Sequence, residues 1–182
     1  MSVTQEQILI EKCRIGESDS FAPLMKNYRR QLFSYLLRLC GNREEAEDLF
    51  QETLIKAWKG IRKYSEQQKF SSWLFTIAHN TAMDNLRKRK RNDITADIEP
   101  DDLQNSADPH SEIVWKEFQN KIHKAVELLS LKQKEVFLLR VNGEMSFREI
   151  ADTTKEPLNT VLSHMHYSVK KIKSFLGNKN EQ

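Results

Sequence analysis

Apolar side chains recur at helical spacing over residues 46–61 without a single miss. Positions three and four apart lie on the same side of an α-helix, so the pattern predicts an amphipathic helix over about 43–62. Trp58 continues the apolar side, which indicates a core residue and not a cofactor contact. The residues of this side are Ala46, Leu49, Phe50, Thr53, Leu54, Ala57, Trp58 and Ile61.

The composition also favours helices. Of 182 residues only 5 are Gly and 4 are Pro, while 30% are charged, which suits a helical bundle better than a sheet with many tight turns. No run approaches the ~18 apolar residues that a membrane span needs, and the N-terminus lacks the pattern of a secretory signal. Cys13 and Cys40 are too few for a disulfide framework, so we expect a chain without membrane insertion in the reducing cytoplasm.

Two further helices are expected before residue 43. A short one over 4–16 ends at Gly16, and a longer one over about 20–40 is stopped by Gly41 and Asn42, since glycine suits the position just after a helix.

Charge divides the chain into parts. Residues 62–91 carry 8 Lys and Arg against 2 Asp and Glu, whereas residues 92–112 carry 7 acidic residues and no Lys or Arg. We predict an all-α fold of two small helical domains, residues 1–91 and 111–182, joined by a flexible acidic linker over 92–110. Basic segments on both sides of an acidic one indicate a polyanionic partner contacted at two places.

The stretch 63–91 combines a polar loop, an aromatic-rich helix and five consecutive basic residues that begin at Arg87. Aromatic rings stack on bases and cations neutralise phosphates, so the stretch predicts binding of single-stranded or partly opened DNA. A plain surface helix with a basic end is the alternative. On a helical wheel the inward side is Leu74, Ile77, Ala78 and Thr81, with Asn85 as its polar exception, and the outward side is Thr76, Asn80, Met83 and Arg87, beside Trp73 and Asp84.

The opposite face of the predicted helix 43–62 is acidic around one isoleucine. It carries Asp48, Glu52 and Ile55, flanked by Gln51 and Lys56. Such a face resembles a protein-docking surface, but an ordinary solvated helix face has the same pattern.

The C-terminal segment predicts a helix-turn-helix. After a helix over 112–128, capping-box spacing at Ser130 and at Ser146 opens two more helices, and Pro157 begins a last helix that runs to about Leu176. Its outward side carries Thr160, Ser163, Tyr167 and Lys170, with His166 and Lys171 at the margins. Hydroxyls at the start of a recognition helix can reach base edges while lysines reach phosphates.

No catalytic grouping is found. The sequence has no Gly-rich phosphate loop and no Ser/His/Asp set, and His164 and His166 diverge by about 200° on a helix, too far to share a metal. We therefore expect no enzymatic activity, no catalytic residues, no metal and no cofactor.

Five segments together resemble a known family. Residues 48–58 (DLFQETLIKAW) are similar to the DxxQETFxKAW stretch of bacterial RNA polymerase sigma factors, in particular those of the extracytoplasmic-function (ECF) group. Residues 70–80 (FSSWLFTIAHN) with 86–91 (LRKRKR) resemble the FxxWLyxIAxN…lRxxxR signature of that group. Residues 129–139 and 147–151 are similar to its C-terminal domain.

The resemblance implies that each domain reads one promoter element. It implies that the helix over 43–62 docks on the clamp coiled coil of core RNA polymerase through Asp48, Gln51, Glu52, Ile55 and Lys56. It implies a site for the opened downstream (−10) element at Lys63, Tyr64, Lys69, Phe70, Trp73, Thr76, Asn80, Met83, Arg87 and Lys88. Our own hypothesis is that a loop pocket lined by Tyr64, Phe70 and Trp73 captures an unstacked base. The upstream (−35) duplex is expected at Arg148, Thr160, Ser163, His166, Tyr167, Lys170 and Lys171. An anti-sigma protein is a further implied partner, since members of the group are commonly held by one.

The last helix departs from the family pattern GTVxSRLxRAR. Asn159 stands in place of the glycine, and usual basic positions hold Leu162, His164, Tyr167 and Val169. Fewer cations release fewer counterions, so we expect weaker and less salt-sensitive duplex binding.

Two other functions remain open on the residues alone. A conventional helix-turn-helix regulator would account for residues 130–176 but not for the basic stretch with Trp73. A helical adaptor protein would carry the basic segments without using them.

Overall fold

The computed structural model describes residues 3–65, 69–92 and 121–177. Within these ranges every regular element is helical, so the predicted all-α class is confirmed. The predicted linker over 92–110 lies outside the described residues except for Asn92, and the helix expected over 112–128 is described only from residue 121.

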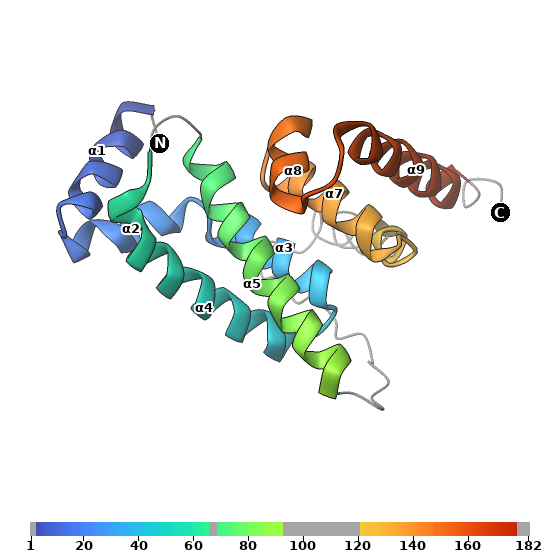
Figure 1. The fold of residues 1–182 in the computed structure, drawn as a ribbon, viewed down its shortest axis with the longest axis horizontal. Coiled ribbons are helices and arrows are strands. Elements are labelled where there is room, and N and C mark those ends of the chain that lie inside the picture. The colour runs from blue at the N-terminus through green and yellow to red at the C-terminus, as the bar shows by residue number, and fades with distance from the viewer. Residues whose placement is uncertain (1–2, 66–68, 93–120, 178–182) are drawn as a thin grey trace, which may run out of the picture.

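The N-terminal part is a helical bundle whose core lies between α3 (Arg29–Cys40), α4 (Arg43–Gly60) and α5 (Phe70–Asn92) (Figure 1). The elements are α1 (Val3–Arg14), a 3-10 turn (Ser18–Ser20), α2 (Phe21–Lys26), α3 (Arg29–Cys40), α4 (Arg43–Gly60), a second 3-10 turn (Ile61–Lys63) and α5 (Phe70–Asn92). The apolar side predicted for residues 46–61 is buried at Ala46, Leu49, Thr53, Ala57 and Ile61, where α4 packs against α3 and α5.

The helix expected over 20–40 is in fact two, α2 and α3, with a turn at Asn27 and Tyr28 between them. Tyr28 is buried, its hydroxyl donates to Glu6 Oε1 at 2.8 Å, and its ring lies 5.5 Å from that of Phe70. These contacts come from α1 and α5, so the local apolar pattern did not reveal the break.

The predicted helix ends are confirmed where caps were expected. Gly41 follows α3 in the left-handed conformation (φ 77°), which glycine adopts without a Cβ penalty. Asn42 then caps α4, because its side chain accepts a hydrogen bond from the Glu45 N–H at 2.9 Å.

The C-terminal part comprises a helical segment over 121–127, α7 (Leu131–Asn142), α8 (Phe147–Thr154) and α9 (Leu158–Gly177). Both predicted capping boxes are present, at Ser130 with Gln133 and at Ser146 with Glu149. Lys155 has a positive φ of 59° in the short turn from α8 to α9, and α9 packs on both α7 and α8. This arrangement is a helix-turn-helix.

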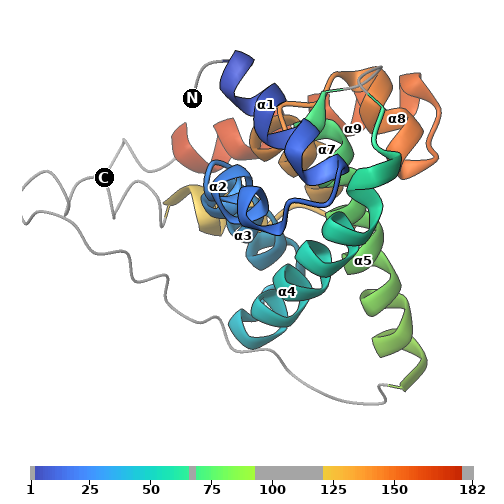
Figure 2. The same cartoon turned by 90° about the vertical axis from the view of Figure 1, so that its left-hand side faces the viewer.

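The two parts pack against each other. Helix α7 contacts α3 and helix α8 contacts α5, and α8 lies beside α5 in both views (Figures 1 and 2). Helix α9 lies at the end of the long axis farthest from α1 (Figure 1). One connected cluster of buried side chains extends through both parts, so the described residues form a closed arrangement.

Candidate nucleic-acid interface

An aromatic cluster marks the start of α5. The rings of Tyr64, Phe70 and Trp73 lie 5.3–5.4 Å from one another, and Tyr64 and Phe70 are only 5% and 3% exposed. The three residues predicted to line a base pocket therefore lie together, but their rings pack on one another. Trp73 alone of the three is partly exposed.

Beyond the cluster, α5 presents polar and basic side chains to solvent. Asn80, Arg87 and Lys88 are exposed, as are Lys63 and Lys69 before the helix. Arg87 forms an exposed ion pair with Asp84 at 3.2 Å, which a phosphate can replace at little cost because exposed pairs are weak. These residues form a cationic edge on which a nucleic-acid backbone can lie.

Two residues predicted to face outward are half-buried, Thr76 and Met83. Thr76 is covered by the C-terminal part, since its Oγ1 lies 2.9 Å from Thr153 Oγ1 of α8. Access of DNA to Thr76 therefore requires that α8 move away from α5.

Sequence reasoning missed a second buried side of α5, formed by Phe75, His79 and Ala82. Phe75 packs edge-on against Tyr35 with centroids 5.4 Å apart, and a Cβ at Gly143 would come within 3.0 Å of Phe75 Cγ. Part of the signal was present, because Phe75 and Ala82 have i, i+7 spacing and so lie on one side of the helix. Helix α5 thus packs against both α4 and the C-terminal part.

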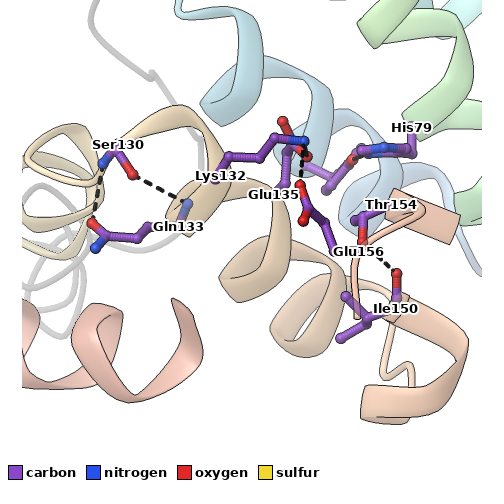
Figure 3. Close-up of polar contacts among 9 residues, drawn as sticks. His79, Ser130, Lys132, Gln133, Glu135, Ile150, Thr154 and Glu156 are labelled. Carbon is purple, nitrogen blue, oxygen red and sulfur yellow. Dashed lines mark hydrogen bonds and ion pairs between the residues drawn. The ribbon is translucent and has the colours of Figure 1, made fainter. Parts of the chain in front are cut away.

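A polar cluster lies where the two parts meet. Lys132 Nζ of α7 is 3.3 Å from Glu135 Oε2 and 3.2 Å from Glu156 Oε1 (Figure 3). Burial raises the pKa of Glu135 despite the opposing Lys132 charge. The Glu135 carboxylate also helps burial to raise the pKa of Tyr35 on α3.

His79 of α5 is 3% exposed and hydrogen-bonded through Nδ1 to the Tyr35 hydroxyl at 3.1 Å. Burial, with smaller effects from the Lys132 and Arg87 charges, lowers the pKa of His79 to about 4. The ring is therefore neutral near pH 7 and acts as a structural residue beneath the interface, and not as a cation for DNA.

The candidate docking face on α4 is open to solvent. Asp48, Gln51, Glu52, Ile55 and Lys56 are all exposed, Ile55 by 53%. Lys56 pairs with Glu52 at 2.8 Å and donates to Thr81 Oγ1 of α5 at 3.1 Å. An exposed isoleucine surrounded by positioned charges can bury apolar area against a partner.

The outward face of α9 is set by its buried side, Val161, Ser168 and Ile172. Ser163, His166, Tyr167, Lys170 and Lys171 are exposed, together with Arg148 on α8, and Thr160 is half-buried. The structure thus places six of the seven predicted upstream residues at the surface.

Two other kinds of site are not found among the residues that the structure describes. Across the described residues no three His, Cys, Asp or Glu side chains gather as metal ligands would. None of the described helices has the length and apolar content that a membrane crossing requires.

Comparison with known proteins identifies the chain. Residues 24–92 match the family model Sigma-70 region 2, and residues 119–172 match Sigma-70, region 4. The ECF RNA polymerase sigma factor SigW of Bacillus subtilis is 31% identical over 167 residues, which cover 86% of this chain and 89% of SigW. The chain belongs to the ECF family of RNA polymerase sigma factors.

A second relative agrees with this family, and two solved structures share the fold. RNA polymerase sigma-H factor of Pseudomonas aeruginosa is 26% identical over 88% of each chain. The sigma factor RpoE of Bartonella quintana, solved with the anti-sigma factor NepR, superposes with a TM-score of 0.68 at 22% identity, over 86% of this chain and 96% of that one. CnrH, solved with the cytosolic domain of CnrY, gives 0.66 at 17% identity, over 96% and 98%. At these identities the two structures support the fold alone.

In this ECF sigma factor, the region 2 match contains the α4 face and α5, and the region 4 match contains α7, α8 and most of α9. Family membership sets aside the regulator and adaptor alternatives. The roles of individual side chains at the three faces remain predictions.

Proposed function

We propose that this ECF sigma factor directs RNA polymerase to promoters and opens DNA by binding alone, without catalysing a reaction. The observation that carries the proposal is the exposed edge of α5, where Asn80, Arg87 and Lys88 lie beyond the partly exposed Trp73. A binding site for an opened strand needs cations for phosphates and a ring for a base, and α5 has both.

The free-energy cost of unstacking a base and the gain from stacking it on an aromatic ring are of comparable size. Unstacking and unpairing a base costs a few kcal/mol, and stacking it on an aromatic side chain returns roughly 1–3 kcal/mol. Trp73 offers the ring, while Tyr64 and Phe70 hold it in place by packing against it. The protein then binds a strand that has opened, and no hydrolysis reaction is needed to open it.

Helix α4 is the proposed contact with core polymerase, at its clamp coiled coil. Its exposed face, defined by Asp48, Gln51, Glu52, Ile55 and Lys56, lies on the same bundle as α5. Binding of polymerase there would carry the strand-trapping edge to the enzyme that uses the opened DNA, in the cytoplasm.

The closed arrangement must open for this function. Elements centred near −10 and −35 are about 25 base pairs apart, which is about 85 Å of duplex, yet Thr76 and Thr153 are in hydrogen-bond contact. A peptide of 28 residues extends to at most about 95 Å, so the length of sequence between Asn92 and Lys121 permits the separation. We infer that polymerase binds the form in which α7 and α8 have left α3 and α5.

An anti-sigma protein is a proposed further partner. RpoE of Bartonella quintana is solved with one, and here the exposed α4 face is available for such a contact. An anti-sigma protein bound there would compete with core polymerase.

The function is tested by run-off transcription with core polymerase and a pool of genomic promoters, with permanganate reactivity of unpaired thymines to follow opening. Asn80→Ala is expected to lower opening at least several-fold while core binding stays unchanged. Gln5→Ala, which removes an exposed amide from α1, is the matched control. Unchanged opening by Asn80→Ala would remove α5 from the proposed role, and failure of the wild-type chain to co-elute with core polymerase would overturn the function itself.

A further inference from the structure

Two leucines lie exposed at the start of the recognition helix. Leu158 and Leu162 are 38% and 41% exposed and stand one turn apart on α9. Asn159, beside Leu158, is exposed as well. No Lys or Arg occurs between Lys155 and Lys170, so the first three turns of α9 carry none of the side chains that most often contact guanine.

The rotation of α9 accounts for this exposure. Val161 and Ser168 are fully buried, and the Ser168 hydroxyl lies 2.7 Å from His164 O within α9 and 3.3 Å from Gln133 O of α7. With that side held against α7, the side that bears Leu158 and Leu162 cannot turn into the core. Single exposed leucines are common on protein surfaces. A pair of them at the start of a helix in a DNA-binding domain indicates a ligand-binding role.

The polar residues beside the two leucines indicate which base pair this part of α9 can contact. Ser163 Oγ donates its hydrogen to Asn159 O at 2.9 Å, so towards a base it can only accept, as from adenine N6 or cytosine N4. The Asn159 amide can form two hydrogen bonds to adenine N6 and N7. In the major groove the apolar feature of an A·T pair is the thymine methyl group, which aliphatic side chains contact.

We propose that Leu158 and Leu162 read thymine methyl groups in the upstream promoter element, with Asn159 reading adenine. The inference rests on the proposed function of promoter recognition and on the expectation that α9 enters the major groove of the upstream element. Apolar contacts replace the missing arginines, and the lysines from Lys170 onward supply the phosphate contacts. Specificity for A·T pairs then comes with the low salt dependence expected of a recognition helix poor in cations.

Uracil in place of thymine tests the proposal directly, because it removes only the methyl group and keeps the base pairing. Holoenzyme made with the full chain selects binding sequences from promoter fragments randomised over the upstream element. The selected fragment is then made with uracil in that element alone. Wild-type holoenzyme is expected to lose roughly three- to fivefold in affinity for each methyl that it contacts, about the effect of one buried methylene.

The variants separate this contact from general binding. Leu158→Ala and Leu162→Ala are expected to bind the thymine fragment more weakly and to lose the discrimination against uracil. Lys170→Ala should weaken both fragments equally and reduce the salt dependence. Leu128→Ala, at a leucine that is 54% exposed outside α9, is the matched control and should behave as wild type.

Three results would overturn the proposal. The first is equal affinity for thymine and uracil fragments, and the second is discrimination that persists in both leucine variants. The third is that the leucine variants bind DNA normally but no longer bind core polymerase, which would make the leucine pair a protein-docking surface. In each case run-off transcription by the wild-type chain would still uphold the proposed function.

Discussion

Thr153 of α8 donates a hydrogen bond to Thr76 of α5, with the two hydroxyl oxygens 2.9 Å apart. The direction follows because a threonine hydroxyl has one hydrogen, and that of Thr76 is already donated to Ser72 O at 2.8 Å. A residue predicted to contact opened DNA therefore serves, in the closed arrangement, as an acceptor for the other domain.

Gly143 lies at the end of α7, against Phe75 of α5. A Cβ there would lie 2.8 Å from Leu139 O of α7 itself and 3.0 Å from Phe75 Cγ of α5, so Gly143→Ala strains the end of α7 and pushes against Phe75. We expect a loss of about 1–3 kcal/mol in the free energy of unfolding, measured with urea. Gly177→Ala, where a Cβ meets nothing within 4 Å, should leave this free energy unchanged, and an unchanged value for Gly143→Ala would contradict the prediction.

His79 should make stability depend on pH. Its pKa is about 4 in the folded chain, lowered chiefly by burial, against about 6.5 when unfolded. Between these values the unfolded state binds a proton that the folded state does not, so the free energy of unfolding decreases as the pH falls from about 6.5 to 4, by roughly 3 kcal/mol in all. A protonated ring can no longer accept from the Tyr35 hydroxyl.

The measurement is urea unfolding at several pH values for the wild type and His79→Gln. Glu135, whose pKa burial raises, acts in the opposite direction, and it is present in both proteins. The difference between the two curves therefore isolates His79, and identical pH slopes would refute its role.

Ser146 caps the first helix of the helix-turn-helix. It accepts from the Glu149 N–H, and the Glu149 side chain accepts from the Ser146 N–H at 2.7 Å. Ser146→Ala should lower the free energy of unfolding by about 1 kcal/mol, and Ser146→Asp should restore most of it. Ser174→Ala, at an exposed position within α9, is the control in the same thermal unfolding series.

Ile55 should contribute to polymerase affinity without a role in folding. Ile55→Ala is expected to weaken binding to core polymerase about tenfold, since apolar anchors at interface centres dominate affinity. Ile8→Ala makes the same change at an equally exposed position on α1, 52% against 53%. Equal affinities of the two variants in a core-polymerase titration would place the docking surface elsewhere.

Much of the fold followed from local patterns. The apolar spacing over 46–61 predicted α4, and glycine and serine positions predicted the ends of α3, α7 and α8, because caps depend on residues within one turn of a helix end. The surface positions of α4 and α9 were also predictable from local sequence, because the helical period alone assigns them.

What the sequence by itself determined is a set of capped amphipathic helices, the separation of charge along the chain and the family. Only the tertiary structure decided which side of α5 packs on α8, where α2 breaks from α3, and that Thr76, His79 and Lys132 meet at one interface. Those outcomes depend on contacts between residues tens of positions apart, and a helix that is buried on two sides has no single apolar stripe from which its partners could be predicted.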